Sequence, residues 1–260
     1  MITYHDISKD YGAVNVFSPF EELNNIVAKV DALSKNNISD IVSNRGQYRY
    51  SDKIYDEHPE EMKKTADRRI APSAFDRMPN LFTSDKPSDG YEYVQIYGND
   101  GNDRVFRWFR KDYLVPVENL DKYKVFISKA DGAAGQIGSP IPARICGKPV
   151  VMGPNIGSTE TYISIGSVNS EFEANSIAKY VKTKFARVML GVLKVTQNNA
   201  KPVWSKIPLQ NFTDNSDIDW TKTISDIDKQ LYLKYHLSLD EIQFIESHVQ
   251  EMNRCPLLRR

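Results

Sequence analysis

The stretch from Tyr162 to Val195 reads YISIGSVNSEFEANSIAKYVKTKFARVMLGVLKV and predicts a strand followed by a long helix. Alternating β-branched and polar residues up to Val168 are typical of a half-buried strand. Ser170 and Glu173 then form a capping box, in which each side chain satisfies a free backbone N–H of the first helical turn. The residues after the box repeat apolar side chains at helical spacing, so we expect a broad apolar stripe that packs on a sheet.

The residues before this stretch predict further strands with loops between them. Residues 91–98 and 105–110 (YEYVQIYG and VFRWFR) flank a polar turn that contains glycine, which is typical of a β-hairpin. Residues 123–128 (YKVFIS) and 148–153 (KPVVMG) are two more predicted strands. Because no regular helices separate these strands, a doubly wound parallel fold is disfavoured. We expect an α+β fold with a central, mostly antiparallel or mixed sheet, long loops, a long packing helix and a C-terminal helical pair.

The two ends of the chain are predicted to be more helical. A helix is expected from Pro19 to Asn37, a shorter one after it, and another within PEEMKKTADRR, residues 59–69. Near the C-terminus, residues 219–236 predict one helix, and a second begins at the capping box of Ser238 and Glu241 and runs to about Met252. The expected domains are a helical, loop-rich segment (1–90), a sheet-containing domain (91–210) and a C-terminal helical pair (211–260).

Composition places the chain among globular proteins. Of 260 residues, 40% are hydrophobic and 26% are charged, and no apolar run reaches the roughly 18 residues of a membrane span. The N-terminus lacks the cationic and apolar blocks of a signal peptide. Two cysteines, Cys146 and Cys255, do not form a disulfide framework, so we expect reduced thiols in a cytoplasmic protein without membrane contact.

Charge is balanced overall but unevenly distributed. The net charge is zero, yet residues 101–150 carry nine cations against five anions, a net of +4. Residues 211–251 carry three cations against nine anions, a net of −6. Such asymmetry is expected when one face of a protein meets a polyanion and another does not, although chance also produces it.

A glycine-bearing loop follows the strand at residues 123–128. The sequence FISKADGAAGQIGSP, from Phe126 to Pro140, allows three interpretations: a nucleotide cradle, a loop that lies in a nucleic-acid groove, and an ordinary turn. Its glycine spacing matches no phosphate-binding fingerprint, and the prolines that follow prevent the helix that a phosphate cradle needs. The groove-binding loop and the ordinary turn both stay open.

Basic and aromatic residues precede this loop. Arginine can contact phosphate or guanine, lysine neutralises phosphate, and aromatic rings stack on bases. Alternation along a strand is the competing explanation, since it would place Arg107 in water and Trp108 in the core. The segment RGQYRY, residues 45–50, carries the same pattern with the same ambiguity.

Catalytic and metal-binding patterns are weak in this sequence. The four histidines share no ligand spacing with the cysteines. No G-x-S-x-G elbow of a serine hydrolase occurs. Glu61 and Lys63 match the E-x-K fragment of nuclease sites, but this tripeptide is common. The acids of DNSDIDWTKTISDID, residues 214–228, are explained more simply as the N-terminus of a helix.

Several runs resemble one enzyme family: KTKFAR (182–187), LKVTQ (193–197), W-x-x-IPLQ-x-F (204–212) and SDIDW-TK-x-I-x-x-IDKQLY-KY-L (216–237). Over residues 90–252 the chain is similar to the region that follows the adenine-specific methylase domain in bacterial Type II restriction-modification enzymes. The resemblance implies a target-recognition domain, the module that reads the DNA sequence for a catalytic domain. The [ND]PP[YF] motif and the S-adenosylmethionine glycine motif of such methylases do not occur here, so we expect a fragment or separate specificity module, with Met1 an added start.

The resemblance therefore implies double-stranded DNA and a catalytic methylase or endonuclease domain as partners, with no metal or cofactor bound by this chain. S-adenosylmethionine and magnesium are expected for the catalytic domains, and no catalysis is expected from this chain alone. The alternatives are a protein-interaction module whose acidic C-terminal helices dock a catalytic subunit, and a metal-dependent nuclease. Gln136 is the candidate for adenine readout. The predicted DNA-binding residues are Arg104, Arg107, Arg110, Lys111, Lys129, Gly132, Gly135, Gln136 and Arg144.

Overall fold

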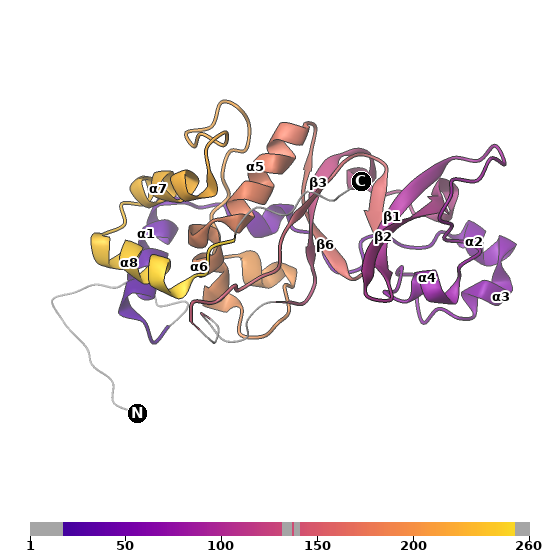
Figure 1. Cartoon of the computed structure of the whole chain (residues 1–260), viewed down its shortest axis with the longest axis horizontal. Helices are drawn as coiled ribbons and strands as arrows, with labels where there is room; N and C mark the ends of the chain where they lie inside the picture. The colour runs from indigo at the N-terminus through magenta and orange to yellow at the C-terminus, as the bar shows by residue number, and fades with distance from the viewer. Residues whose placement is uncertain (1–17, 132–136, 138–140, 253–260) are drawn as a thin grey trace.

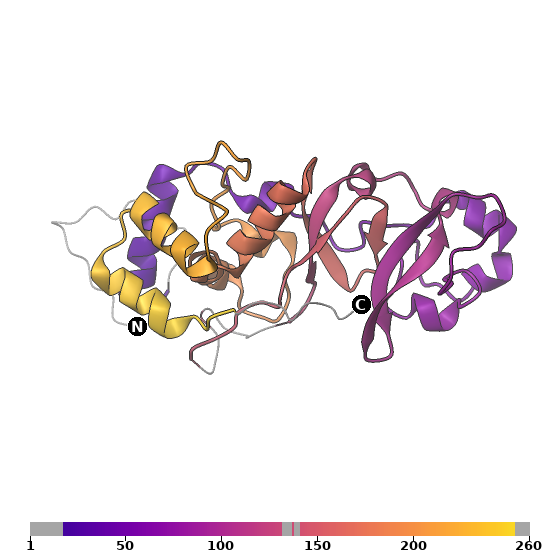
Figure 2. The ribbon, with the colours of Figure 1, turned by 45° about the horizontal axis from the view of Figure 1, so that its top comes forward.

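The computed structural model describes residues 18–131, 137 and 141–252. It has the expected α+β architecture, with two small sheets and helices at both ends of the molecule (Figure 1). The molecule is elongated in both views. Helices α2, α3 and α4 lie beside the β1–β2 hairpin at one end, and the helices α5 to α8 gather with α1 at the other (Figures 1 and 2).

The first sheet is built on the predicted hairpin. Strands β1 (Tyr93–Asp100) and β2 (Asp103–Arg110) pair antiparallel in continuous register, from Tyr93 opposite Arg110 to Asp100 opposite Asp103. The two-residue turn contains Gly101 at φ 58°, a left-handed conformation that favours glycine. The short strand β5 (Ile156–Ser158) adds in parallel to β1, so β2 is an edge strand.

The second sheet is wholly antiparallel. Strand β3 (Tyr123–Ser128) lies between β4 (Val150–Met152) and β6 (Tyr162–Val168). The sequence predicted one central sheet, whereas the structure has two sheets of three strands. The split arises because the chain pairs with β1 at residues 156–158 and with β3 at residues 162–168, so residues 159–161 cross from one sheet to the other.

The predicted helix after residue 170 begins at the expected capping box but is two helices. The helix α5 (Glu171–Lys182) ends at Thr183, where ψ is 149°, and α6 (Lys184–Leu193) begins there. The hydroxyl of Thr183 accepts a hydrogen bond from the N–H of Ala186, and the carboxylate of Asp228 accepts from the N–H groups of Lys184 and Phe185. The break is therefore stabilised by caps that include a residue from a distant helix.

The remaining helices of this end surround α6. Helix α1 (Glu21–Leu33) contacts both α6 and α8. Helix α7 (Ile224–Lys234) begins at Thr223, later than predicted, and α8 (Leu239–His248) begins at the predicted capping box of Ser238 and Glu241 and ends before Met252. Of the acids that were expected at this helix N-terminus, Asp226 lies in the first turn of α7, whereas Asp214, Asp217 and Asp219 precede the helix. A short 3₁₀ turn, η1 (Ile38–Ile41), follows α1.

Short helical turns and bridges organise residues 45–90. Helices α2 (Asp52–Glu57), α3 (Pro59–Met62) and α4 (Ala74–Arg77) are short, so the helix predicted over residues 59–69 ends at Met62. Residues 68–70 are extended instead, because they pair with residues 48–50. The N–H of Tyr50 donates to the carbonyl of Arg68, and the N–H of Ile70 donates to the carbonyl of Tyr48. The other 3₁₀ turns are η2 (Lys111–Tyr113), η3 (Glu118–Asp121) and η4 (Lys201–Trp204).

Two clusters of buried residues form the cores. One contains buried residues of the segment 23–42, which holds α1 and η1. It also contains buried residues between Val125 in β3 and Met252, after α8. The other takes in residues 48–82, the β1–β2 hairpin, and one face of β3 and β6, including Phe126 and Tyr162. All three predicted domains contribute residues to the first cluster. The boundaries at 90 and 210 stay a prediction. The chain passes from one cluster to the other at residues 43–47.

Candidate nucleic-acid interface

Glu160 is the centre of a group of cations at the crossing between the two sheets. Its backbone N–H donates to the carbonyl of Ile70 at 2.8 Å, and its side chain is only 10% exposed. Arg45 binds the carboxylate through two hydrogen bonds, Nη2 to Oε1 at 2.9 Å and Nε to Oε2 at 3.0 Å. Arg69 lies 3.3 Å and Lys129 lies 3.6 Å from the same carboxylate. One carboxylate is thus shared by three cations.

The charges of this group alter its titration. Burial works to raise the pKa of Glu160, but the hydrogen bond from Arg45 and the charges of Lys129, Arg45 and Arg69 outweigh it and hold that pKa below its usual value. The pKa of the Lys129 ammonium is lowered, first by burial, and the attraction of Glu160 opposes this shift. The negative charge of Glu160 therefore offsets the repulsion among three cationic side chains at a partly buried position.

The turn before Arg49 brings one further cation, Arg49, near this group. Gly46 has φ 69°, and a Cβ on it would lie 2.4 Å from Cδ of Arg69, so the stem of Arg69 crosses directly against the turn. Arg69 also pairs with Asp67, whose pKa is lowered by Arg69 and, to a smaller extent, by Arg49. The following residues, which we call the Glu160 cluster, carry five cations and two acids: Arg45, Arg49, Arg69, Lys129, Lys201, Glu160 and Asp67.

Lys201 joins this cluster through a surface pocket. The pocket has a volume of about 330 Å³ and is lined by residues 42–47, Arg49 and Lys201. Lys201 is the first residue of η4, which is anchored by the buried Trp204, whose Nε1 donates to the carbonyl of Asn199 at 3.0 Å. The lining holds three cationic side chains and no carboxylate. Such a lining attracts anions.

The predicted glycine loop begins beside the cluster and has a fixed base. The carboxylate of Asp131 accepts from the N–H of Gly147 at 2.6 Å and from Nδ2 of Asn199 at 3.1 Å. The buried ammonium of Lys194 donates to the carbonyl of Asp131 at 2.5 Å and to that of Ile145. The N–H of Asn199 donates to the carbonyl of Lys129 at 2.7 Å. These bonds tie both ends of the segment between residues 131 and 147 to the start of η4.

The structure places the loop residues of the predicted site as follows. Lys129 is in the Glu160 cluster, and Arg144 is exposed at the other end of the loop base, next to the carbonyl of Ile145. Gly132, Gly135 and Gln136 lie outside the described residues. The loop therefore begins and ends between exposed or partly exposed cations, and the roles predicted for its glycines and glutamine stay predictions.

The four predicted residues of β2 and η2 do not form one surface. Arg104 is exposed near the hairpin turn, close to Tyr162, where its charge opposes the rise in the pKa of Tyr162 that burial causes. Tyr162 pairs with Ser128, the residue before Lys129. Arg107 pairs with Asp100 in the middle of the strand. Arg104 and Arg110 are six positions apart, which corresponds to about 20 Å along a strand.

Arg110 is used inside the protein, in contrast to its predicted contact with DNA. Its side chain is 9% exposed and binds Glu57 at 2.9 Å and Asp112 at 2.7 Å. Its guanidinium also lies 3.7 Å from the ring centroid of Tyr91 and donates to the hydroxyl of Tyr113 at 2.8 Å. Because two carboxylates and the rings of Tyr91 and Tyr113 hold this side chain, the proposed interface does not include Arg110.

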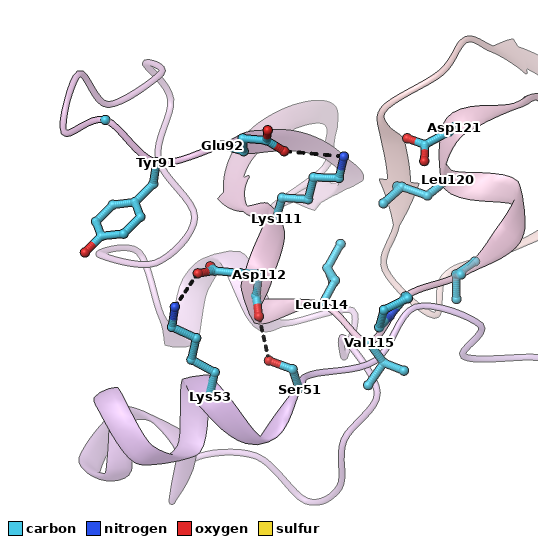
Figure 3. A pocket seen from close by; sticks show the side chains of 13 residues that line it. Ser51, Lys53, Tyr91, Glu92, Lys111, Asp112, Leu114, Val115, Leu120 and Asp121 are labelled. Atoms are coloured by element: carbon cyan, nitrogen blue, oxygen red, sulfur yellow. Dashed lines mark hydrogen bonds and ion pairs between the residues drawn. The ribbon is translucent and has the colours of Figure 1, made fainter.

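Lys111 lies at a second pocket, which is shown in Figure 3. The pocket has a volume of about 670 Å³, and its floor includes Leu114 and Val115. Lys111 pairs with Glu92 at 3.5 Å, and Lys53 on α2 pairs with Asp112 at 2.6 Å. With Asp121 the lining carries three carboxylates against two lysines, so this pocket is less suited than the Glu160 cluster to a polyanion.

Sequence reasoning missed the acidic centre and two of the cations. Arg45 and Arg49 stand in the basic and aromatic segment 45–50, but no local sequence pattern marks Arg69, Lys201 or Glu160. The pairing of Arg45 with Glu160 joins residues 115 positions apart. Only the tertiary fold brings these residues together.

The nuclease alternative gains no geometric support. Glu61 and Lys63 lie at the end of the short helix α3, and Lys63 pairs with Glu60 at 2.5 Å. Across the described part of the chain, no three histidine, cysteine or acidic side chains are grouped in a way that could hold a metal ion. The described cysteine, Cys146, is buried and unpaired.

A comparison of the chain with models of known protein families finds no match, and neither does a comparison with curated protein sequences. The resemblance to restriction-modification enzymes therefore stays a prediction. Among the helices of the described ranges, none combines the length and the apolar character that crossing a bilayer requires.

Proposed function

We propose that this chain recognises a specific sequence in double-stranded DNA, as the target-recognition module of a bacterial Type II restriction-modification enzyme in the cytoplasm. The observation that carries the proposal is the Glu160 cluster, in which Lys129, Arg45 and Arg69 share one carboxylate at the start of the glycine loop. Five cations against two acids leave the cluster with a net charge of +3, and such surfaces bind the phosphates of DNA.

The arrangement supports both parts of sequence recognition. Cations of the cluster would hold the DNA backbone and set the register of the protein on the duplex. The loop tied at Asp131 and Gly147 would lie over a groove, where base edges are read. The exposed Arg104 and Arg144 would add further phosphate contacts. A methylase for adenine N6 or an endonuclease, supplied by another domain or subunit with S-adenosylmethionine or magnesium, would carry out the chemistry.

Binding to a random-sequence duplex pool across a salt series tests this function. We expect affinity to fall steeply as salt rises and a short motif to be enriched. Lys129→Ala should weaken binding to every duplex, whereas Lys63→Ala, which removes an exposed lysine of α3 outside the cluster, should not. Equal binding by both variants, or no enrichment from the pool, contradicts the proposal. Magnesium-dependent nicking by the purified chain would contradict the absence of catalysis.

Protein docking is a second candidate function, favoured by the helical pair at the C-terminus. Leu233 at the end of α7 is 76% exposed, and Leu239 at the start of α8 is 84% exposed. Exposed leucines among acidic residues fit a partner surface with apolar and basic side chains. Leu233→Ser with Leu239→Ser should abolish co-purification with a catalytic subunit and leave DNA binding unchanged, if the two activities use different faces.

A further inference from the structure

The pocket lined by Arg45, Arg49 and Lys201 also contains the side-chain amide of Gln47, whose oxygen is hydrogen-bonded. Oε1 of Gln47 accepts from Oγ of Ser164 at 2.7 Å and from Nδ2 of Asn119 at 3.2 Å. Asn119 is held in turn by the hydroxyl of Tyr48, which donates to its Oδ1 at 3.0 Å. Since Oε1 is occupied, the orientation of the amide is fixed, and Nε2 has no acceptor within the described residues.

The other groups that line this pocket are also donors. Arg45 and Arg49 are exposed, and Lys201 is partly exposed on the facing segment η4. Arg45 donates two hydrogen bonds to Glu160. Among the described residues, the guanidinium of Arg49 donates only through Nε, to the carbonyl of Gly46 at 3.3 Å. No ion pair holds Lys201 within the described ranges. The residues that line this one hollow therefore supply guanidinium, ammonium and amide N–H groups, and none of them is a carboxylate.

A phosphate group matches this chemistry. Its oxygens accept several hydrogen bonds, carry negative charge and pair well with arginine. The hollow, at about 330 Å³, holds roughly ten water molecules, so a phosphate fits with part of its hydration. Glutamine with a free Oε1 and Nε2 could read adenine in two contacts, but the occupied Oε1 of Gln47 leaves only a donor. A lining of donors alone does not pair with an adenine edge, and its three cationic side chains favour a charged acceptor such as phosphate over the neutral acceptors of guanine.

We infer that the pocket lined by residues 42–47, Arg49 and Lys201 binds one backbone phosphate of the DNA, with Gln47 Nε2, Arg49 and Lys201 as donors. This inference rests on the proposed function, and it assigns to the pocket a positioning contact rather than base readout. Lys129, which shares Glu160 with Arg45, is then left for the neighbouring part of the duplex.

Two kinds of variant test the pocket in duplex binding. Lys201→Ala and Arg49→Ala each remove one cation, so each should weaken all sequences by the same factor and lower the slope of log affinity against log salt by about 0.9. Gln47→Glu keeps an oxygen acceptor for Ser164 and Asn119 and places a negative oxygen where Nε2 stood. It should weaken binding more than Lys201→Ala. Lys222→Ala, an exposed lysine before α7, is the matched control and should leave the slope unchanged.

Inorganic phosphate is the second probe, because it separates the pocket from the proposed function. Titration should shift the amide signals of Asn44, Gly46 and Gln47 in the wild-type chain but not in Lys201→Ala. If no duplex binds and phosphate still gives these shifts, the DNA function is wrong and the anion pocket stands. If duplexes bind and neither the salt slope nor the phosphate signals respond to Lys201→Ala, the pocket inference is overturned while the function stands. A changed sequence preference in Lys201→Ala overturns the positioning role as well.

Discussion

The carboxylate of Asp131 and the N–H of Gly147, sixteen residues apart, meet at 2.6 Å and close the base of the segment between them. The same carboxylate holds Nδ2 of Asn199, and Lys194 binds backbone carbonyls at both ends of the segment. A Cβ on Gly147 would lie 1.8 Å from Oδ2 of Asp131. The closure therefore depends on the absence of a side chain at position 147.

Gly147→Ala is expected to open this base. The added methyl group must displace the Asp131 carboxylate, which loses bonds to the backbone and to Asn199, and we expect the free energy of unfolding to fall by about 1–3 kcal/mol. Gly153→Ala is the matched control, because its Cβ would have only an ordinary contact at 3.9 Å with Tyr123. Urea unfolding of both variants provides the measurement. Equal stability of the two would contradict the close approach at residue 147.

Glu160→Gln is expected to destabilise the crossing between the two sheets. The variant leaves Arg45, Arg69 and Lys129 together without their shared carboxylate, so we expect a loss of about 1–3 kcal/mol at neutral pH. The lowered pKa of Glu160 means that its contribution to stability is present above the pKa of the unfolded chain and is lost as pH falls through the folded value. The difference between wild type and variant should therefore shrink in acid.

Glu92→Gln is the control for this measurement. Glu92 is 82% exposed and pairs with Lys111 at 3.5 Å, and such surface pairs contribute little to stability. Unfolding curves at neutral and acidic pH should therefore change little for Glu92→Gln. If Glu160→Gln has the same free energy of unfolding as wild type at neutral pH, the shared carboxylate does not stabilise the fold.

Asp228 makes stability depend on pH in the opposite direction. Burial raises the pKa of Asp228 to about 7, although hydrogen bonds from Phe185 and Lys184 oppose the shift. A carboxyl group with a raised pKa stabilises the fold fully below its unfolded value, and this contribution is lost as pH rises toward 7. The wild type should thus lose up to about 4 kcal/mol of this contribution between pH 4 and 8, whereas Asp228→Asn should lack that dependence.

Unfolding of Asp228→Asn at both ends of this pH range measures the effect. The variant should be less stable than wild type in acid, because the amide must cap Lys184 and Phe185 with one oxygen, and should gain on wild type as pH rises. Asp240→Asn changes an exposed acid of α8 and is the control. A stability difference between wild type and Asp228→Asn that is constant with pH would contradict the raised pKa.

Local signals in the sequence predicted much of this fold. Capping boxes at Ser170 and Ser238 gave the starts of α5 and α8 because they depend on residues three positions apart. The break at Thr183 was missed, since threonine tolerates a helix interior and its partner in the break, Asp228, lies on α7. The division into two sheets was missed for the same reason, because it depends on which strands β5 and β6 choose as neighbours.

The candidate site was predictable only in part. Lys129 could be proposed from the loop that follows it, and Arg45 stood in a segment of basic and aromatic residues. Glu160 gave no signal, because its importance comes from cations that reach it from residues 45, 69 and 129. The sequence groups Arg104 and Arg110 because they are close along the chain. In the structure they lie near opposite ends of β2, in different environments.

Arg104→Ala and Arg110→Ala should therefore have opposite effects. Arg104 is exposed near Tyr162, so its loss should weaken duplex binding and leave the free energy of unfolding within about 0.5 kcal/mol of wild type. Arg110 binds Glu57 and Asp112 and lies against the rings of Tyr91 and Tyr113. Its loss removes these contacts, while Lys53 still pairs with both carboxylates, so it should cost about 1–2 kcal/mol. Urea unfolding and duplex binding of the same two preparations give both quantities. If Arg110→Ala is as stable as wild type but binds DNA more weakly, Arg110 contacts DNA and its structural role is contradicted.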